Sequence, residues 1–333
     1  MNKAAHFYVN YNNIVVLNGY LDVIKQSLIQ CGFTCDEIVS VEGMNKDDLY
    51  VFPMGIDAFK FYHKGYKNFI LWQQGATADE SYMRNKSKLR YRILNYMDCF
   101  AMKKAQMVFF CSQYMKEHYE RLARRSFAHK SYCMPCYNEK LLPDSIDAKD
   151  YTKKNFAYVG SLDLWQCFDE TAKLYKEIEN RFPDAHFKVL TFSVQEAVEK
   201  IKALGIKNYE VKCVKKEDVQ NELKDIVYGF VVRRDSIVNR VATPTKLSSY
   251  MSAGVIPIFS SVLDDFRKIS GSMKYAVAFE SLNDASELMK AINLPIDKDE
   301  LKEEYEHLFN TYYGTQNHTN RISDMMKGIF NNE

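Results

Sequence analysis

The stretch 228-YGFVVRRDSIVNRVATPTKLSSYMSAG-254 indicates the fold class of this chain. Residues 228–232 are aromatic or β-branched apart from one glycine, which is typical of a buried strand. Residues 245–253 favour a helix, for which Thr243 can be the N-cap and Pro244 the first residue. A strand, a polar loop and a capped helix in this order form the repeating unit of a parallel sheet.

The same stretch is rich in cations. Arg233, Arg234, Arg240 and Lys246 are expected to gather near the start of the predicted helix. The backbone N–H groups and the dipole of a helix N-terminus favour anions, and arginine offers a fork that matches phosphate oxygens. We therefore predict that this turn binds a phosphate-bearing ligand. The alternative is a basic surface loop with an ordinary helix cap.

Short apolar runs alternate with amphipathic stretches along the whole chain, which predicts an α/β protein built of βα units. The expected strands are 4–9, 38–41, 49–52, 68–72, 107–110, 131–134, 156–159, 186–190, 210–214, 228–232, 256–259 and 276–279. The expected helices are 20–30, 56–64, 82–105, 112–122, 165–181, 194–204, 218–225, 245–253, 263–269, 281–292, 298–312 and 316–331.

A chain of 333 residues is longer than one hydrophobic core usually supports. The alternation stops in a polar stretch near residue 142 and then begins again. We therefore predict two Rossmann-like, doubly wound domains that face each other across a cleft. Their expected bounds are 1–142 and 154–315, with a linker at 143–153 and a C-terminal helix at 316–333. Ligands in such sheets bind at the carboxyl ends of the strands.

Two further segments place polar residues at the end of a predicted strand. In the first, Gly160 allows a ligand to approach the backbone, Ser161 and Gln166 can donate hydrogen bonds, and Trp165 can pack on a base or a sugar. The alternative is a tight turn with a core tryptophan. The second segment combines aromatic and amide groups suited to hydroxyl-rich ligands: Trp72, Gln73, Gln74 and Gly75.

Two carboxylates follow this second segment. Asp79 or Glu80 could accept a proton from an acceptor hydroxyl. Either could instead only stabilise the start of the next helix, because acids favour a helix N-terminus. The sequence leaves both interpretations open.

The net charge of +2 names no partner, but cations are unevenly distributed. Between residues 84 and 130 there are 12 Lys and Arg against three acids, with tyrosines interleaved. Such a surface can contact anionic lipid, or it can be an ordinary solvated helix face. No nucleic-acid-binding motif accompanies it. We see no signal peptide and no apolar run that could cross a bilayer, so we expect a cytoplasmic protein that contacts the inner membrane leaflet.

The eight cysteines are expected to be free thiols. Cys133 and Cys136 form a CxxC motif, but neither a second CxxC nor a histidine pair stands at zinc spacing, so both are interpreted as packing at a strand end. P-loop, GxGxxG, GxSxG and HExxH motifs do not occur. Asp163, Asp169 and Glu170 form no DxD pair, so we predict neither a metal ion nor another required cofactor.

Several motifs resemble GT-B glycosyltransferases. In the second half these are 158-YVGSL-162, Trp165-Gln166 and the run from Pro244 to Ile258, which look like the donor domain of retaining enzymes in glycosyltransferase family 4. In the first half, 72-WQQG-75, 80-ESYM-83 and 109-FFCSQYM-115 resemble members that build bacterial surface polysaccharides.

The resemblance implies a hexosyltransferase-type enzyme that transfers sugar, with retention, from a UDP- or GDP-linked donor to a glycan or lipid-linked acceptor. It implies that the C-terminal domain binds the donor, that Trp72 to Gly75 meet the acceptor, and that the last helix returns to the N-terminal domain. The donor-binding residues expected are Gly160, Ser161, Trp165, Gln166, Arg233, Asn239, Thr243, Thr245 and Ser249. The catalytic residues expected are Arg234, Arg240, Lys246 and Glu80.

The chain departs from the family at three positions. Ser161 and Gln166 stand where many members carry Arg and Lys, and one of the arginines between 233 and 240 could replace them. Ser249 stands where many members carry a glutamate that binds the ribose. Two alternatives therefore remain: a GT-B epimerase or phosphorylase, and a non-catalytic protein that binds nucleotide sugars or glycans.

Overall fold

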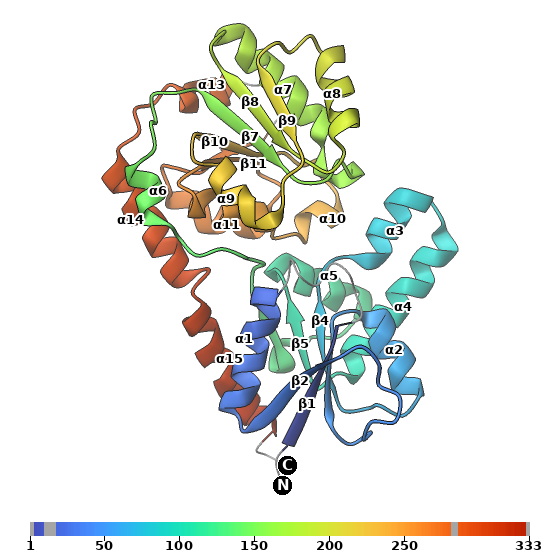
Figure 1. Ribbon diagram of the computed structural model, residues 1–333. Helices are drawn as coiled ribbons and strands as arrows, with labels where there is room; N and C mark the ends of the chain where they lie inside the picture. Colours follow the sequence, from blue (N-terminus) through green and yellow to red (C-terminus); the bar gives the residue numbers. More distant parts are fainter. Residues whose placement is uncertain (1–2, 10–17, 281–285, 331–333) are drawn as a thin grey trace. The chain divides into compact units, whose positions relative to one another are not determined.

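The computed structural model describes residues 3–9, 18–280 and 286–330, and it divides into two compact units (Figure 1). The first unit contains the chain up to Asn138, the short segment Arg240–Thr243 and the chain from Tyr313 onward. The second unit contains Glu139–Asn239 and Pro244–Tyr312. Each unit is built on one six-stranded parallel sheet.

Sheet A of the first unit has the strand order β2-β1-β3-β4-β5-β6. Its strands are β1 (Lys3–Tyr8), β2 (Phe33–Ile38), β3 (Leu49–Phe52), β4 (Phe69–Gln73), β5 (Met107–Phe110) and β6 (Ser131–Cys133). Its helices are α1 (Asn18–Gln30), α2 (Gly55–His63), α3 (Thr77–Asn85), α4 (Lys88–Lys104), α5 (Gln113–Ala123) and α15 (Thr315–Phe330). Figure 1 shows α1 and α15 on one side of this sheet and α2 and α4 on the other.

Sheet B of the second unit has the order β12-β11-β10-β7-β8-β9. Its strands are β7 (Asn155–Val159), β8 (His186–Leu190), β9 (Tyr209–Lys212), β10 (Tyr228–Val231), β11 (Ile256–Ser260) and β12 (Val277–Phe279). The helices around it are α6 (Pro143–Asp147), α7 (Phe168–Arg181), α8 (Val194–Ala203), α9 (Val219–Glu222), α10 (Ile237–Arg240), α11 (Thr245–Ser252), α12 (Asp264–Ile269), α13 (Ser286–Ile292) and α14 (Lys298–Thr311). Short 3-10 turns lie at Ala128–Lys130, Leu164–Gln166, Lys216–Asp218 and Ser270–Ser272.

The predicted α/β class with two parallel, doubly wound sheets is confirmed. In each sheet the strand order reverses once, between β1 and β3 in sheet A and between β7 and β10 in sheet B. At such a reversal the connections leave toward opposite faces, which opens a crevice at the carboxyl ends of the two strands. These two points are therefore the first places to look for a ligand.

Two predicted elements differ clearly from the structure in their bounds. The strand expected at 38–41 lies at Phe33–Ile38, where it pairs with β1 from Lys3 to Tyr8. The single helix expected at 82–105 is two helices, because Lys86 adopts a left-handed conformation (φ +54°) and Ser87 then caps α4. Residues 281–285 of the helix expected at 281–292, and residue 331 of the last helix, lie outside the described residues.

Helix α15 packs along α1 within the first unit. The contact is close because serines meet the facing backbone: Ser27 Oγ donates to the Thr319 carbonyl at 3.2 Å, and Ser323 Oγ donates to the Ser27 carbonyl at 3.3 Å. Phe330 at the end of α15 meets the Phe33 ring edge-on. The last helix thus completes the face of sheet A that α1 begins to cover.

In the second unit a buried lysine closes the turn that follows α9. Lys149 Nζ donates to the carbonyl oxygens of Leu223, Lys224 and Ile226 at 2.7, 2.9 and 2.7 Å. The last carbonyls of a helix have no donor within the helix. One ammonium group supplies three donors here, so it fixes this turn at the entry to β10.

We predict that Lys149→Met lowers the free energy of unfolding by about 2 to 4 kcal/mol, because it leaves buried carbonyl groups without a donor. Urea unfolding followed by circular dichroism measures this loss. The control is Lys153→Met, which removes an exposed lysine of the same segment and should stay within about 0.5 kcal/mol of the parent. Equal stabilities of the two variants would contradict the capping role.

Candidate functional site

The candidate site lies where the strand order of sheet B reverses. Gly160 follows β7, and Arg233 follows the neighbouring strand β10 by two residues. Helix α11 begins at Thr245, and its first N–H groups have no acceptor inside the helix. The site thus combines the carboxyl ends of the adjacent strands β7 and β10 with the N-terminus of α11.

Tyr250 holds α11 against these two strands. Its ring is fully buried, and its hydroxyl accepts a hydrogen bond from the Val159 N–H at 3.0 Å. A Cβ on Gly229 of β10 would lie 2.6 Å from the Tyr250 ring, so the ring fits only because this residue is glycine. The tyrosine and the glycine together fix the first turn of α11 beside the end of β7.

Lys246 in that first turn lies against Gly160. A Cβ added to Gly160 would stand 2.7 Å from both Cε and Nζ of the lysine. Gly160 also has φ +135°, which side-chain-bearing residues rarely adopt. The Lys246 ammonium lies 4.6 Å from the centre of the Tyr158 ring, within the range of a cation–π contact. Glycine is thus needed at this position on two grounds.

Two cations converge on one neutral oxygen. Gln166 Oε1 accepts from Arg233 Nη2 at 2.7 Å and from Lys246 Nζ at 2.5 Å. Arg233 is only 3% exposed, and its Nη1 donates to the carbonyls of Gln166 and Val232. Within residues 3–9, 18–280 and 286–330, neither cation forms an ion pair with a carboxylate. The positive charge of the pair is therefore only weakly offset, since Asp163 raises the pKa of Lys246 less than burial and Arg233 lower it.

Burial is the main influence on the titration of both groups. Burial, with the charge of Arg233 second, lowers the pKa of Lys246 well below its ordinary value. Burial also lowers the pKa of Arg233. An anion placed beside the two groups would supply the missing charge and favour the protonated lysine. The arrangement is suited to a ligand that carries phosphate.

The other two cations of the sequence prediction have different partners. The Arg234 side chain is 65% exposed and forms an ion pair with Glu170 of α7. Arg240 belongs to the first unit, where its guanidinium lies 5.8 Å from the centre of the Tyr114 ring. Arg233 and Lys246 are the pair that the structure brings together.

The predicted N-cap is also wrong. The N-cap of α11 is Pro244, without a side-chain hydrogen bond. The Thr243 hydroxyl instead accepts from the Cys136 N–H at 3.0 Å, inside the first unit. Nearby, Ser112 Oγ donates to the Val241 carbonyl at 2.7 Å. The segment before α11 is thus held by the first unit's own residues.

The remaining donor-site candidates lie on the segments of chain that carry Gln166 and the two cations. Asn239 is buried and its Nδ2 donates to the Arg234 carbonyl at 2.9 Å. Ser249 Oγ donates to the Thr245 carbonyl at 3.1 Å, one turn back in α11. Ser161 Oγ donates to Asp163 at 2.8 Å, and Trp165 is half-buried.

In the first unit, two predicted acceptor contacts prove to be core residues. Trp72 is fully buried and its ring stacks on Tyr20, with centroids 4.2 Å apart. Gln73 is also buried, and its Nε2 lies within hydrogen-bond distance of Gly75 O, Asp98 Oδ2 and the Tyr119 hydroxyl. Both side chains are thus part of the packed interior of the first unit. Apolar strand position and aromatic character are shared by core and ligand-binding residues, so the sequence could not separate them.

Gln74, Gly75 and Glu80 remain partly accessible at the carboxyl end of β4. A Cβ on Gly75 would lie 2.6 Å from Glu80 Oε1, so the glycine makes room for this carboxylate. Asp98 of α4 was not singled out from the sequence. It is buried behind this loop, and burial raises its pKa to about 7. An acid inside the apolar face of a helix is the signal that could have revealed it.

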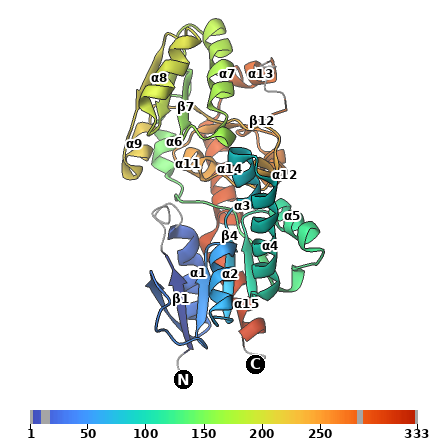
Figure 2. The ribbon, with the colours of Figure 1, turned by 90° about the vertical axis from the view of Figure 1, so that its right-hand side faces the viewer.

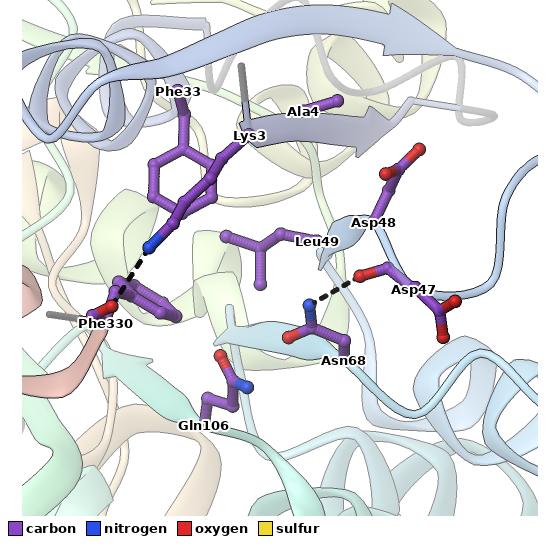
Figure 3. Close-up of a pocket in the computed structure, with 9 residues that line it drawn as sticks. All are labelled: Lys3, Ala4, Phe33, Asp47, Asp48, Leu49, Asn68, Gln106 and Phe330. Atoms are coloured by element: carbon purple, nitrogen blue, oxygen red, sulfur yellow. Dashed lines mark hydrogen bonds between the residues drawn. The ribbon is translucent and has the colours of Figure 1, made fainter. Parts of the chain in front are cut away.

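A separate pocket of about 230 Å³ lies at the amino ends of β1 to β3 in sheet A (Figure 3). Lys3 Nζ there donates to the Phe330 carbonyl, and Asn68 Nδ2 donates to the Asp47 carbonyl. Both donors are thus already used by the protein's own backbone. The pocket also lies at the opposite end of the strands from the edge where α/β sheets bind ligands.

Comparisons with known proteins support the fold. No protein-family model matches the chain, and no curated protein matches its sequence. Among solved structures, the lipopolysaccharide outer core galactosyltransferase WaaB superposes with a TM-score of 0.63 at 12% identity, covering 96% of this chain and 99% of that one. A trehalose-phosphate synthase from Burkholderia xenovorans, in complex with glucose-6-phosphate, gives 0.59 at 12% identity, with 94% and 77% covered.

S. aureus TarM, solved as a point mutant with fondaparinux, alpha-GlcNAc-glycerol and UDP, gives a TM-score of 0.61 at 10% identity. The match covers 87% of this chain but only 57% of the TarM chain. At these identities the likeness establishes the fold. The chain has the two-domain α/β fold of GT-B glycosyltransferases.

We predict that Lys246→Met removes anion binding without destabilising the empty protein. The folded state holds the Lys246 proton more weakly than the unfolded chain does. The free energy of unfolding of the parent should therefore rise as the pH increases toward about 10.4, the pKa of lysine in the unfolded chain. At pH 7 the variant should not carry the free-energy cost of burying this charged amine. Inorganic pyrophosphate should raise the melting temperature of the parent but not that of the variant.

The matched control is Lys268→Met, which removes an exposed lysine of α12 in the same unit. It should keep the full pyrophosphate shift. A full shift in Lys246→Met would contradict the assignment of this site.

Proposed function

We propose that this protein is a glycosyltransferase that moves a sugar from a nucleotide-diphosphate sugar to a glycan or lipid-linked acceptor. The observation that carries the proposal is the pair of cations, Arg233 and Lys246, on Gln166 beside Gly160. UDP is present in the structure of TarM, which has a similar fold. A diphosphate is an anion of the size and charge that two adjacent cations and a helix N-terminus accommodate.

The proposed chemistry follows from where charge develops. As the bond between sugar and diphosphate breaks, negative charge gathers on the leaving oxygen. Lys246, Arg233 and the first N–H groups of α11 are already oriented there, so they stabilise the leaving group without reorganisation and without a metal ion. Arg233 would then replace the Arg and Lys that many family 4 enzymes carry at the positions of Ser161 and Gln166.

We assign the other candidates because they lie on the segments of chain that carry Gln166, Arg233 and Lys246. Gly160, Ser161, Trp165, Asn239 and Thr245 would surround the donor. Ser249 would meet the ribose through a hydroxyl in place of the usual carboxylate. We give Arg234, Arg240 and Thr243 no direct role, because their side chains contact Glu170, Tyr114 and the Cys136 N–H.

For the acceptor we propose the accessible end of β4. Gln74 and Gly75 would contact its hydroxyl groups, and Glu80 would accept the proton of the attacking one. Retention of configuration, transfer of a hexose and a place in surface polysaccharide synthesis are proposed from the sequence motifs alone. Proton NMR of the product linkage tests the stereochemical part.

The decisive experiment combines ligand binding with turnover. UDP, GDP and their sugars are screened by thermal shift, and release of the nucleoside diphosphate is then measured with candidate acceptors. We predict that Lys246→Ala lowers turnover about 30- to 1,000-fold, equivalent to about 2–4 kcal/mol of lost transition-state stabilisation. Lys268→Ala is the control and should match the parent.

The alternatives give different results. An epimerase would change the donor without any acceptor, and a binding protein would show a thermal shift but never release nucleoside diphosphate. If no nucleotide or nucleotide sugar changes the melting temperature, the proposed function is wrong.

We further propose that the first unit contacts an anionic membrane through α4. Within the described residues, no helix is both long and apolar enough to cross a bilayer. Helix α4 instead exposes an apolar stripe, with Leu89, Ile93 and Tyr96 at 70, 49 and 62% exposure. These residues are four and three positions apart, so they lie on one face of the helix. Figures 1 and 2 show α4 beside α3 on the outside of the first unit.

The charges beside this stripe support an anionic membrane as its proposed partner. Lys88 and Arg92 are exposed on one flank, and Arg90 is exposed on the other. Apolar side chains between cations are the pattern by which a helix lies in the interface of a bilayer with anionic headgroups. Such contact would bring the protein to lipid-linked acceptors.

We predict that the triple variant Leu89→Ser, Ile93→Ser, Tyr96→Ser binds phosphatidylglycerol-containing vesicles at least about tenfold more weakly than the parent, because it loses three apolar contacts. Vesicle flotation measures this. The control triple variant is Val39→Ser, Ile269→Ser, Leu294→Ser, which removes exposed apolar groups that do not form a stripe. Equal binding of both variants, or binding by the parent that is insensitive to salt and to anionic lipid, would contradict the proposal.

A further inference from the structure

Two cysteines meet at the carboxyl edge of sheet A. Cys111 follows β5 directly, and Cys136 lies three residues beyond β6, the neighbouring strand. Their Sγ atoms are 3.3 Å apart. The other cysteine of the CxxC motif, Cys133, instead has its Sγ 3.6 Å from the Ser112 carbonyl. The close pair is therefore formed between two strands and not within the motif.

The geometry allows a bond between the two sulfurs. A disulfide has an S–S distance of about 2.05 Å, so the sulfurs would need to approach by roughly 1.3 Å. Small rotations about the two Cα–Cβ bonds can supply this movement. The backbone around the pair is already held by the Met134 N–H, which donates to the Phe110 carbonyl at 2.9 Å.

The two thiols differ in access. Cys111 is 2% exposed, whereas Cys136 is only half-buried. The neighbouring Cys111 thiol lowers the pKa of Cys136, while the contact with Cys136 and burial raise the pKa of Cys111. The thiolate is the nucleophile in disulfide exchange. Cys136 is thus the sulfur that meets an oxidant, and Cys111 is the one that resolves the intermediate.

We propose that Cys111 and Cys136 are a reversible disulfide-forming site that exchanges with low-molecular-weight disulfides such as oxidised glutathione. The Cys136 thiolate attacks one sulfur of the small disulfide, whose S–S bond breaks and releases one thiol. Cys111 gives up its proton and attacks Cys136 Sγ, which releases the second thiol. The protein loses two electrons and two protons, and the small disulfide becomes two thiols.

The bond would act on two loops that border the same edge. The Cys111 thiol lies 3.5 and 3.6 Å from the carbonyls of Gln73 and Gln74, and it would lose the proton that it can donate to them. The Cys136 N–H holds the Thr243 hydroxyl, so the second sulfur is tied to the segment before α11. This inference does not depend on the proposed sugar transfer.

The test uses the full chain, incubated with mixtures of oxidised and reduced glutathione. Free thiols are blocked with N-ethylmaleimide in denaturant, and linked peptides are mapped by mass spectrometry. We expect a Cys111–Cys136 peptide that appears as the mixture becomes more oxidising and disappears with dithiothreitol. The oxidised protein should also melt at a higher temperature, because the bond restricts the unfolded chain.

Two variants sharpen the result. Cys133→Ser leaves the pair intact and should give the same linked peptide. Cys111→Ser removes the resolving sulfur, so Cys136 should accumulate as the glutathione mixed disulfide. Exposed Cys213 is the internal control and should form only a mixed disulfide. A Cys133–Cys136 link in the parent, or Cys111 that stays fully reduced in every mixture, would overturn the proposal.

Discussion

The shared hydrogen bonding of Arg233 and Lys246 to Gln166 Oε1 is the interaction on which the candidate site depends. Two cations on one amide oxygen repel each other, and burial removes the water that would screen them. An isolated arrangement of this kind destabilises the folded chain. It persists because the surrounding residues hold both side chains in place, and it becomes favourable once an anion enters.

The neighbouring residues can be understood as supports for that pair. Tyr250 fixes the helix that carries Lys246, and Gly229 makes room for the tyrosine ring. Gly160 makes room for the lysine head and leaves the backbone open. Ser260 Oγ accepts from the Arg233 N–H at 2.8 Å, which fixes the chain where β10 ends. Each of these residues helps to hold the side chain of Arg233 or Lys246 in position.

The sequence predicted the strands of both sheets well where they are buried on both faces, because such strands are continuous apolar runs. The bounds of β3, β5 and β8 agree residue for residue with the prediction. It failed for β2, an edge strand with polar residues, whose exposed side hides the signal. It also failed at Lys86, because a left-handed residue other than glycine leaves no mark in the sequence.

The sequence indicated which segment carries the candidate cations, but not which of these cations lie close together. The predicted strand end and helix start showed where the four cations lie along the chain. Which of them come together in space depends on contacts between residues far apart in the sequence. Gln166 lies 67 residues before Arg233 and 80 before Lys246, so spacing along the chain could not connect them. The same limit applies to Cys111 and Cys136, which lie 25 residues apart. The CxxC spacing suggested Cys133 as the partner of Cys136, whereas the adjacency of β5 and β6 brings Cys111 next to Cys136.

The polar groups at the carboxyl edges of the two sheets differ in the charge of their hydrogen-bond partners. In the first unit, Gln73 Nε2, Asp98 Oδ2 and the Tyr119 hydroxyl lie within hydrogen-bond distance of one another, so a carboxylate takes part. In the second unit, Arg233 and Lys246 meet only neutral oxygens. An internally satisfied network holds a loop in shape, whereas unsatisfied charge attracts a ligand of opposite sign. The charge at the edge of sheet B is therefore the feature that favours an anionic ligand there.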